Sequence, residues 1–281
     1  DIDGAIIFMN AFLNNDPYNE VAWHQLGRQY LAKEMYEQAI TAFDFAVICD
    51  DTFIGAYLEL GKALEYLGRY NEAINHYEIT LGIDDPTAFA LLRIGECHIK
   101  IGNDALGVKF LKKTIHEDPL LEKGWIALCS YYLRKNAYAK VLHYIKKAVK
   151  IDNTQVHYWK FFAQANKALG FFEEASMAYE QMINLGNYEV QTWLDWASVL
   201  VQLQEYENGI NAIRQGLDFH PENSTLQYML AGFYMMQAKA NEASFFLKNA
   251  YKINPKDLDV FYETFPSSRT TPLVKDTLFL N

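Results

Sequence analysis

The stretch that decides the fold is WHQLGRQYLAKEMYEQAITAF at residues 23–43, because its pattern returns along the chain every 34 residues. One column of the repeat holds large, mostly aromatic side chains, at Trp23, Tyr57, Leu91, Trp125, Trp159 and Trp193. Four positions later stands a column of small residues, at Gly27, Gly61, Gly95, Cys129, Ala163, Ala197 and Ala231. The register holds through seven repeats without an insertion or deletion, which predicts a repeat architecture.

Each repeat is predicted to contain two short helices. Apolar residues recur at spacings of three and four on both sides of a break, which places them on one face of a helix in each half. The breaks fall near Gly68, Gly102, Asn136 and Gly170. Small residues are expected where two helices cross closely, because a larger side chain would push the axes apart. A lone hairpin cannot bury its apolar face, so we expect stability to come from stacking.

This pattern resembles the tetratricopeptide repeat family. The family signature runs Trp, Leu-Gly, Tyr, Ala, Phe and Pro across 34 residues. Its counterparts here are Trp23, Leu26, Gly27, Tyr30, Ala39 and Phe43, with Asp51 in the place of the final Pro. Gln227 replaces the aromatic residue in the last full repeat, and His98 and Asn166 replace Tyr in two others. We expect these departures to affect local packing without changing the fold, with His98 in the core or partly buried.

The resemblance implies an all-α fold, a right-handed α-α superhelix of about seven full 34-residue repeats plus partial end repeats. Residues 1–19 fill only the second-helix columns, which suggests a half repeat that is either a cap or the remainder of a longer native sequence. The full repeats are predicted at residues 20–257, as 20–53, 54–87, 88–121, 122–155, 156–189, 190–223 and 224–257. Residues 258–281 are predicted to form a C-terminal cap and tail.

The tail has two interpretations. LDVFYETF at residues 258–265 resembles the start of an eighth first helix, which Pro266 should interrupt. The remaining SSRTTPLVKDTLFLN lacks a clear helical period. This segment either covers the exposed apolar face of the last hairpin, as terminal repeats require, or docks as a linear segment in a groove of this or another copy.

Bulk properties point to a cytoplasmic protein. No apolar run approaches the roughly 18 residues that a membrane span needs, and no stretch near Asp1 reads as a secretory signal. Cys49, Cys97 and Cys129 are an odd number without close spacing, which favours a reducing compartment. We therefore expect no membrane partner.

The sequence contains no pattern of residues typical of an enzyme, and we predict no catalytic residue, no cofactor and no metal. The seven histidines include no pair at i, i+4, and no phosphate-binding Gly-x-x-x-x-Gly-Lys segment occurs. Glu173 and Glu174 are adjacent on a helix and so point in different directions, as expected of a solvated face.

Charge is unevenly distributed along the chain. Residues 1–87 carry 15 acidic side chains against 4 Lys/Arg, residues 88–155 carry 6 against 12, and residues 156–281 carry 14 against 9. The net charge of −10 argues against nucleic-acid binding, which depends on phosphate neutralisation. The basic middle is either a solvated face or a docking surface for an acidic partner, which could be the N-terminal repeats of another copy.

The resemblance also implies a binding surface, the concave face formed by the first helix of each repeat. An apolar strip is predicted there, bordered by cations, and its residues are Leu58, Phe89, Leu92 and Ile126 with Lys62, Arg93 and Lys123. It is either a site for a peptide with apolar anchors and some acidic character or ordinary packing. No three-repeat window offers the Lys, Asn and Arg set with which some family members bind chaperone C-termini.

Two function classes follow. The first is a non-enzymatic scaffold that binds protein or peptide partners, with self-association as one form. The alternative is a regulatory or targeting module for an enzyme carried on a missing domain or a separate chain. The fold alone does not choose between them, because function resides in sites built on the fold.

Overall fold

The computed structural model describes residues 1–83 and 87–278, and every regular element in those ranges is a helix. The first helices of the repeats are α2 (Glu20–Ala32), α4 (Ile54–Tyr66), α6 (Ala88–Lys100), α8 (Glu122–Arg134), α10 (Val156–Leu169), α12 (Val190–Gln202) and α14 (Ser224–Met236). The second helices are α3 (Tyr36–Cys49), α5 (Tyr70–Ile83), α7 (Asp104–Glu117), α9 (Tyr138–Ile151), α11 (Phe172–Asn184), α13 (Tyr206–Phe219) and α15 (Ala240–Ile253). The prediction of an all-α repeat fold is confirmed.

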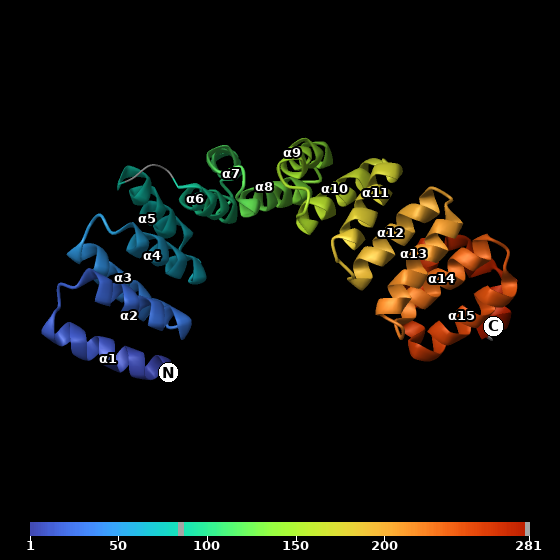
Figure 1. The fold of residues 1–281 in the computed structure, drawn as a ribbon, viewed down its shortest axis with the longest axis horizontal. Helices are drawn as coiled ribbons and strands as arrows, with labels where there is room; N and C mark the ends of the chain where they lie inside the picture. Colours follow the sequence, from blue (N-terminus) through green and yellow to red (C-terminus); the bar gives the residue numbers. More distant parts are fainter. Residues whose placement is uncertain (84–86, 279–281) are drawn as a thin grey trace. The chain divides into compact units, whose positions relative to one another are not determined.

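Helix α1 (Ile2–Asn15) precedes these pairs, and four short elements follow them: η1 (Pro255–Asp257), α16 (Leu258–Thr264), η2 (Pro266–Thr270) and α17 (Pro272–Leu278). The chain forms two compact units, unit 1 (residues 1–131) and unit 2 (residues 132–281), and the boundary falls within α8. Consecutive helices pack against each other within each unit (Figure 1).

The turn inside each hairpin uses one backbone conformation. The residue at a single repeat position has a positive φ, between 53° and 86°, in all seven hairpins: Glu34, Gly68, Gly102, Asn136, Gly170, Gln204 and Ala238. The amide of the next residue donates to a carbonyl five residues back, as Arg69 does to Leu64 over 2.9 Å and Phe171 to Asn166 over 2.9 Å. This is the Schellman motif, which satisfies the last carbonyls of a helix.

The small-residue column lies where the two helices of a hairpin approach most closely. A Cβ atom at Gly27 would lie 2.5 Å from the Phe43 ring, and one at Gly61 would lie 2.6 Å from the Tyr77 ring. Both distances are too short for real atoms, so only glycine fits opposite these rings. The pairing explains why the small column and the Phe/Tyr column occur together in the sequence.

The Trp column fixes the loop that precedes each first helix. The indole N–H of Trp23 donates to the Pro17 carbonyl over 2.9 Å, and Trp125 does the same to Pro119 over 2.9 Å. Gln227, which replaces the aromatic residue, donates through its amide to the Pro221 carbonyl over 3.2 Å. The substitution therefore keeps the hydrogen bond while it loses the ring.

The other two departures are buried. His98 is buried and stacks on Phe110, with ring centroids 5.6 Å apart. Asn166 is buried, and its side-chain amide donates to the Phe162 carbonyl over 2.9 Å. The expectation that His98 belongs to the core is confirmed.

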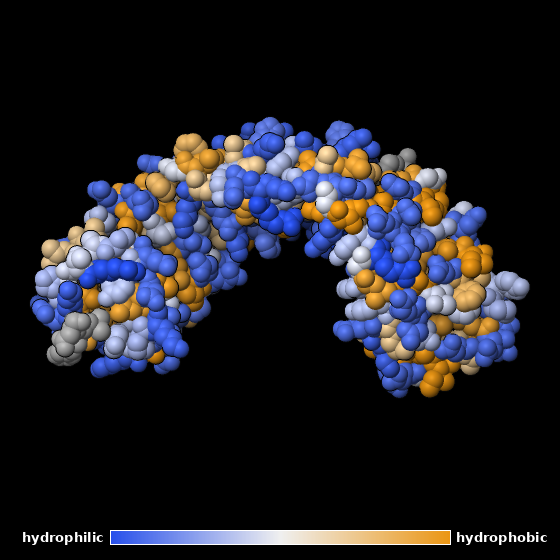
Figure 2. Space-filling model, turned by 180° about the vertical axis from the view of Figure 1, so that it is seen from behind, coloured by the Kyte–Doolittle hydropathy of each residue, from blue (hydrophilic) through white to orange (hydrophobic). Residues whose placement is uncertain are grey.

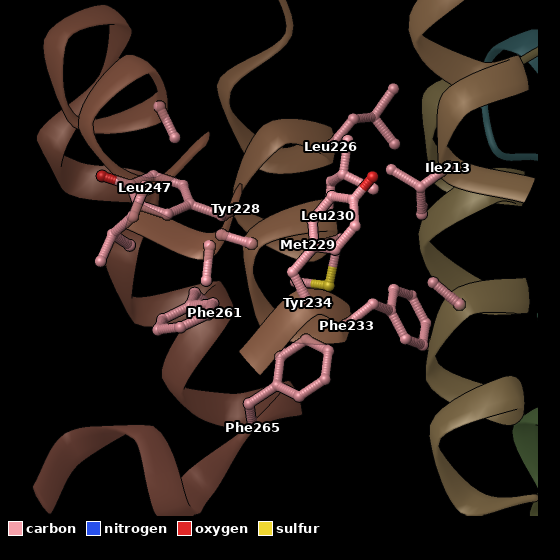
Figure 3. Close-up of a cluster of buried hydrophobic side chains, with 14 of the residues drawn as sticks. Ile213, Leu226, Tyr228, Met229, Leu230, Phe233, Tyr234, Leu247, Phe261 and Phe265 are labelled. Atoms are coloured by element: carbon pink, nitrogen blue, oxygen red, sulfur yellow. The ribbon is translucent and has the colours of Figure 1, made fainter. Parts of the chain in front are cut away.

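The core of unit 2 extends into the C-terminal segment. Figure 3 shows Phe261 and Phe265 beside the aromatic residues of α14, and the Phe233 and Phe265 rings meet edge to face at 5.5 Å. Helix α17 packs on α15 and buries Val274 and Leu278. Residues 258–278 thus cover the last hairpin, as the first interpretation of the tail expects.

Two expectations about this segment have different outcomes. Helix α16 ends at Thr264, before Pro266, as predicted. The absence of a helical period after Pro266 was misleading, because α17 forms over Pro272–Leu278. A helix of two turns is too short to show a period, and its contact with α15 supplies the stability that its own sequence lacks. Residues 279–281 lie outside the described ranges.

Candidate partner-binding groove

A hollow of about 620 Å³ lies on the first helices of unit 1. Its walls come from α2, α4 and α6, with the first residue of α5 and the start of α8 at its ends. The lining residues are His24, Arg28, Gly55, Leu58, Glu59, Lys62, Glu65, Tyr66, Tyr70, Phe89, Arg93, Lys100 and Lys123. A volume of this size is typical of a ligand site.

The apolar part of the groove is accessible to a partner. Phe89 stands at the start of α6 and is 41% exposed, and Leu58 lies beside it on the lining of α4. At the other end of α4, Tyr66 is 58% exposed and stacks on Tyr36 at 4.9 Å. Exposed apolar groups at both ends of one hollow are unusual on a surface that stays in water.

Exposed apolar side chains also occur elsewhere, for example Phe8 and Ile48. Figure 2 shows hydrophobic patches among hydrophilic ones over both units. Single exposed apolar residues are normal on protein surfaces. The groove differs because its apolar residues line a concave hollow together with several cations.

One cation of the groove is held by a partly buried network. Arg93 forms two hydrogen bonds with the Glu65 carboxylate, of 2.9 Å and 2.6 Å, and a third with Glu96 of 2.8 Å. The Tyr77 hydroxyl donates to the same Glu65 carboxylate over 2.7 Å. Burial, and then the neighbouring Glu65 charge, raise the pKa of Tyr77 well above its ordinary value. This network joins α4, α5 and α6 and makes Arg93 a structural residue.

The remaining cations are more available. Lys62 is paired with Glu59 at 3.2 Å, and its side chain is 40% exposed. Arg28, Lys100 and Lys123 form no ion pair with any residue that the structure describes. These three side chains add positive charge to the hollow. Burial raises the pKa of the nearby Glu96 carboxylate, and the charge of Lys100 is among those that oppose this shift.

A histidine lies at the α2 side of the groove. The His24 ring lies 5.7 Å from that of Phe43 and 5.0 Å from that of Phe53. Burial lowers the pKa of His24, and the Glu59 carboxylate opposes this shift. Its Nε2 atom is buried and has no hydrogen-bond partner among the described residues. His24 is therefore neutral at pH 7 and adds no charge to the hollow.

The structure brings together five of the seven residues that the sequence places in the groove. Leu58, Lys62, Phe89, Arg93 and Lys123 line the hollow.

The other two do not line it. Leu92 is only 2% exposed, so its side chain lies in the core and offers no surface to a partner, which corrects the expectation for this residue. Ile126 is half-buried and lies outside the lining. The sequence columns follow the helix face, but they do not show how deeply the neighbouring hairpin buries each position.

Other lining residues extend the groove beyond the predicted set. Tyr66 and Lys100 stand two turns after Leu58 and Leu92 on their helices. Continuing the same columns to the end of each first helix would have found them. Lys100 matters most, because it adds a free cation at the far end of α6.

The described residues provide neither a metal-binding cluster nor a membrane-spanning helix. No three of their His, Cys, Asp or Glu side chains gather so as to hold a metal ion. Within residues 1–83 and 87–278, no helix is both long and apolar enough to cross a membrane. The groove is thus built from helical side chains alone, and what it offers is a shaped, charged surface.

Stacked helical hairpins with a fixed 34-residue period define a class of α-helical repeat proteins. The tetratricopeptide repeat family matches at residues 56–88 and at residues 89–120, which include most of the residues that line the groove. The chain is a tetratricopeptide repeat protein.

Curated relatives share part of the sequence. Tetratricopeptide repeat protein 37 of Xenopus laevis is 24% identical over 193 residues, which are 68% of this chain and 11% of that protein. BBSome complex member BBS4 of Bos taurus is 24% identical over 236 residues, 79% of this chain and 45% of that protein. Superkiller complex protein 3 of Mus musculus is 32% identical over 107 residues, 38% of this chain and 7% of that protein. The chain spans less than half the length of these three relatives.

Solved structures share the fold. The C-terminal part of a TPR repeat-containing protein from Cytophaga hutchinsonii aligns with a TM-score of 0.70 and 15% identity, covering 84% of this chain and 98% of that one. Pseudomonas aeruginosa pilF aligns with a TM-score of 0.56 and 18% identity, covering 74% of this chain and 94% of that one. At these identities the likeness concerns the fold alone.

Proposed function

We propose that this protein is a non-enzymatic scaffold that binds a peptide segment of a partner protein in the groove of unit 1. The observation that carries the proposal is the hollow of about 620 Å³, which is lined by exposed Phe89, half-buried Leu58 and several cations, three of them without an ion pair among the described residues. Apolar residues in a concave surface provide affinity for a peptide, and charges around them provide specificity.

The names of two relatives support the scaffold class. BBS4 and Superkiller complex protein 3 are both named as members of protein complexes. Each matches only part of this chain, so the support concerns the class of function and leaves the partner open.

The residues proposed to contact the partner are Leu58, Lys62, Phe89 and Lys123, with Arg93 holding the groove in shape.

A regulatory or targeting module for an enzyme on another domain or chain is the second candidate. It uses the same groove and differs only in what the bound partner does.

The overall charge of −10 favours protein partners over nucleic acid. Cys49, Cys97 and Cys129 are free thiols, which supports a reducing, cytoplasmic setting. Self-association through the basic residues 88–155 is a further form of partner binding.

A random peptide library displayed on phage tests the proposal. We expect the wild-type protein to select peptides with a shared pattern, and Phe89→Ala to weaken their binding at least tenfold. The matched control is Phe171→Ala, since Phe171 is exposed to a similar degree but lies in unit 2. Peptides that bind the Phe89→Ala protein as well as wild type would remove the groove from consideration.

A further inference from the structure

We infer that the groove of unit 1 recognises an internal acidic segment of its partner, with one large apolar side chain flanked by separated carboxylates. This inference rests on the proposed function and adds the chemistry of the ligand. It follows from which cations of the groove are neutralised, where the free ones stand, and what lies between them.

The groove is more basic than residues 1–87, and three of its cations, Arg93, Lys100 and Lys123, come from the basic residues 88–155. Residues 1–87 carry 15 acidic side chains against 4 Lys/Arg. The described lining of the hollow nevertheless holds five cations and two carboxylates. Both carboxylates are already paired, Glu59 with Lys62 and Glu65 with Arg93. The positive charge left over belongs to Arg28, Lys100 and Lys123, and a ligand with negative charge is the one that compensates it.

The free cations are spread over three helices. Arg28 lies in α2, Lys100 is the last residue of α6, and Lys123 is the second residue of α8. Phe89 and Lys100 are eleven residues apart on α6, which corresponds to about 16 Å along the helix axis. An extended peptide covers that distance in about five residues. Phe89 and Lys123 hold equivalent positions on the successive first helices α6 and α8, and both line the hollow.

This arrangement fits side-chain carboxylates better than a chain terminus. A terminal carboxylate is one small group, and binding it requires several donors that converge on one point. Here the unpaired donors stand on different helices around an apolar centre. We therefore expect acidic residues within about five positions of the apolar residue, and no requirement for a free C-terminus.

The apolar centre has room for a large side chain. Gly55 lines the hollow in the same column as Phe89, one repeat earlier, and Leu58 follows one turn later on α4. With no side chain at Gly55, the space beside Leu58 and Phe89 stays open. A Cβ atom there would first meet the Phe53 ring, at 3.1 Å. Gly55→Leu should therefore fill the space without disturbing the core.

The peptide library described above tests the inference when its selected sequences are read for charge. We expect enrichment of Asp and Glu within about five positions of a Leu, Phe or Trp residue. The selected peptides are then synthesised, and their affinities are measured by fluorescence polarisation for wild type and for the double variant Lys100→Glu/Lys123→Glu. We expect at least a tenfold loss, weaker binding at higher salt, and equal affinity for amidated and free C-termini.

Lys150→Glu is the control, because Lys150 lies on α9 in unit 2, outside the groove. Peptides that depend on Phe89 but show no acidic enrichment would overturn this inference and leave the proposed function standing. Affinity that requires a free C-terminus would also overturn it. If no selected peptide depends on Phe89, the proposed function fails and the inference fails with it.

Discussion

At the scale of single residues, the left-handed turn position shows how strongly the repeat imposes its geometry. Glycine or asparagine occupies it at Gly68, Gly102, Asn136 and Gly170, where a positive φ is tolerated. Glu34, Gln204 and Ala238 adopt the same conformation with φ of 59°, 59° and 57°. For a residue with a Cβ atom, this left-handed conformation costs about 1 kcal/mol or more of conformational free energy. The surrounding hairpin therefore overrides the local preference of these three residues.

Replacing one of them by glycine should stabilise unit 2. We expect Ala238→Gly to raise the free energy of unfolding by about 1 kcal/mol, measured by urea denaturation followed by circular dichroism. Ala168→Gly is the control, because Ala168 is exposed near the end of α10. Glycine disfavours the helix there, so the free energy of unfolding should fall by up to about 1 kcal/mol. Equal losses in both variants would contradict the role given to the turn.

The turn position and the groove also show what the sequence predicts and where it stops. Glycine and asparagine marked four of the breaks, but nothing local marks Ala238, and only the 34-residue period finds it. The period placed Phe89 on the groove correctly and Leu92 incorrectly, because burial depends on the packing of the next hairpin. The sequence also does not show which cations are paired. Arg93, for example, pairs with Glu65, 28 residues away, and this spacing differs from the 34-residue repeat.

Two half-buried histidines, His24 and His76, should give unit 1 a pH dependence. Burial lowers the pKa of both His24 and His76, in each case against the pull of a nearby carboxylate. The unfolded chain, with an ordinary histidine pKa of 6.5, then binds protons before the folded one does. Stability must therefore fall as the pH drops through this value.

Thermal unfolding at pH 7.5 and pH 5.5 tests this expectation. The midpoint should be lower at pH 5.5, and the difference should shrink in the double variant His24→Gln/His76→Gln. Asp44, whose pKa is raised by burial, acts in the opposite direction at lower pH, so the comparison between wild type and the variant is the informative one. An unchanged difference in the variant would assign the pH dependence to other groups.

At the scale of the elements, hairpin geometry depends on what faces each glycine. Two glycines of unit 1 form a matched pair. Gly61 on α4 faces the Tyr77 ring at a distance that excludes a Cβ atom, whereas Gly82 on α5 has nothing within 4 Å of where its Cβ would be. The same substitution should therefore have opposite effects at the two positions.

We expect Gly61→Ala to lower the free energy of unfolding by about 1–3 kcal/mol, because α4 and α5 must separate or Tyr77 must leave its rotamer. Gly82→Ala should raise the free energy by about 0.5–1 kcal/mol, since alanine is the better helix former. Both values come from urea denaturation monitored by the helical circular-dichroism signal. A loss at both positions would mean that hairpin contact is not the cause.

The C-terminal segment acts as an element that closes the core of unit 2. Val274 on α17 is 1% exposed, and its neighbour Lys275 is exposed. Val274→Asp buries an unpaired carboxylate, which should cost about 3 kcal/mol or more. We expect faster amide hydrogen exchange in α15 of this variant. Lys275→Asp should leave α15 protected, and equal exchange in both variants would show that α17 does not cap the hairpin.

At the scale of the whole molecule, each hairpin contacts its sequence neighbours within its unit, and stability is shared locally. Proteins built in this way unfold in segments of different stability. The two units of this chain, residues 1–131 and 132–281, should therefore respond separately to a core defect. One close glycine–ring contact in each unit provides a defect of the same kind.

We expect Gly209→Leu, which forces a side chain against the Phe233 ring, to accelerate amide hydrogen exchange in α12 to α15 and to leave α2 to α5 unchanged. Gly61→Leu should do the reverse, because it drives the same kind of side chain against Tyr77 in unit 1. Exchange followed by mass spectrometry of peptides resolves the two regions in one experiment. Loss of protection along the entire chain in either variant would mean that the repeats unfold as one cooperative block. A local response would mean that a partner bound in the groove of unit 1 stabilises that unit without a comparable effect on unit 2.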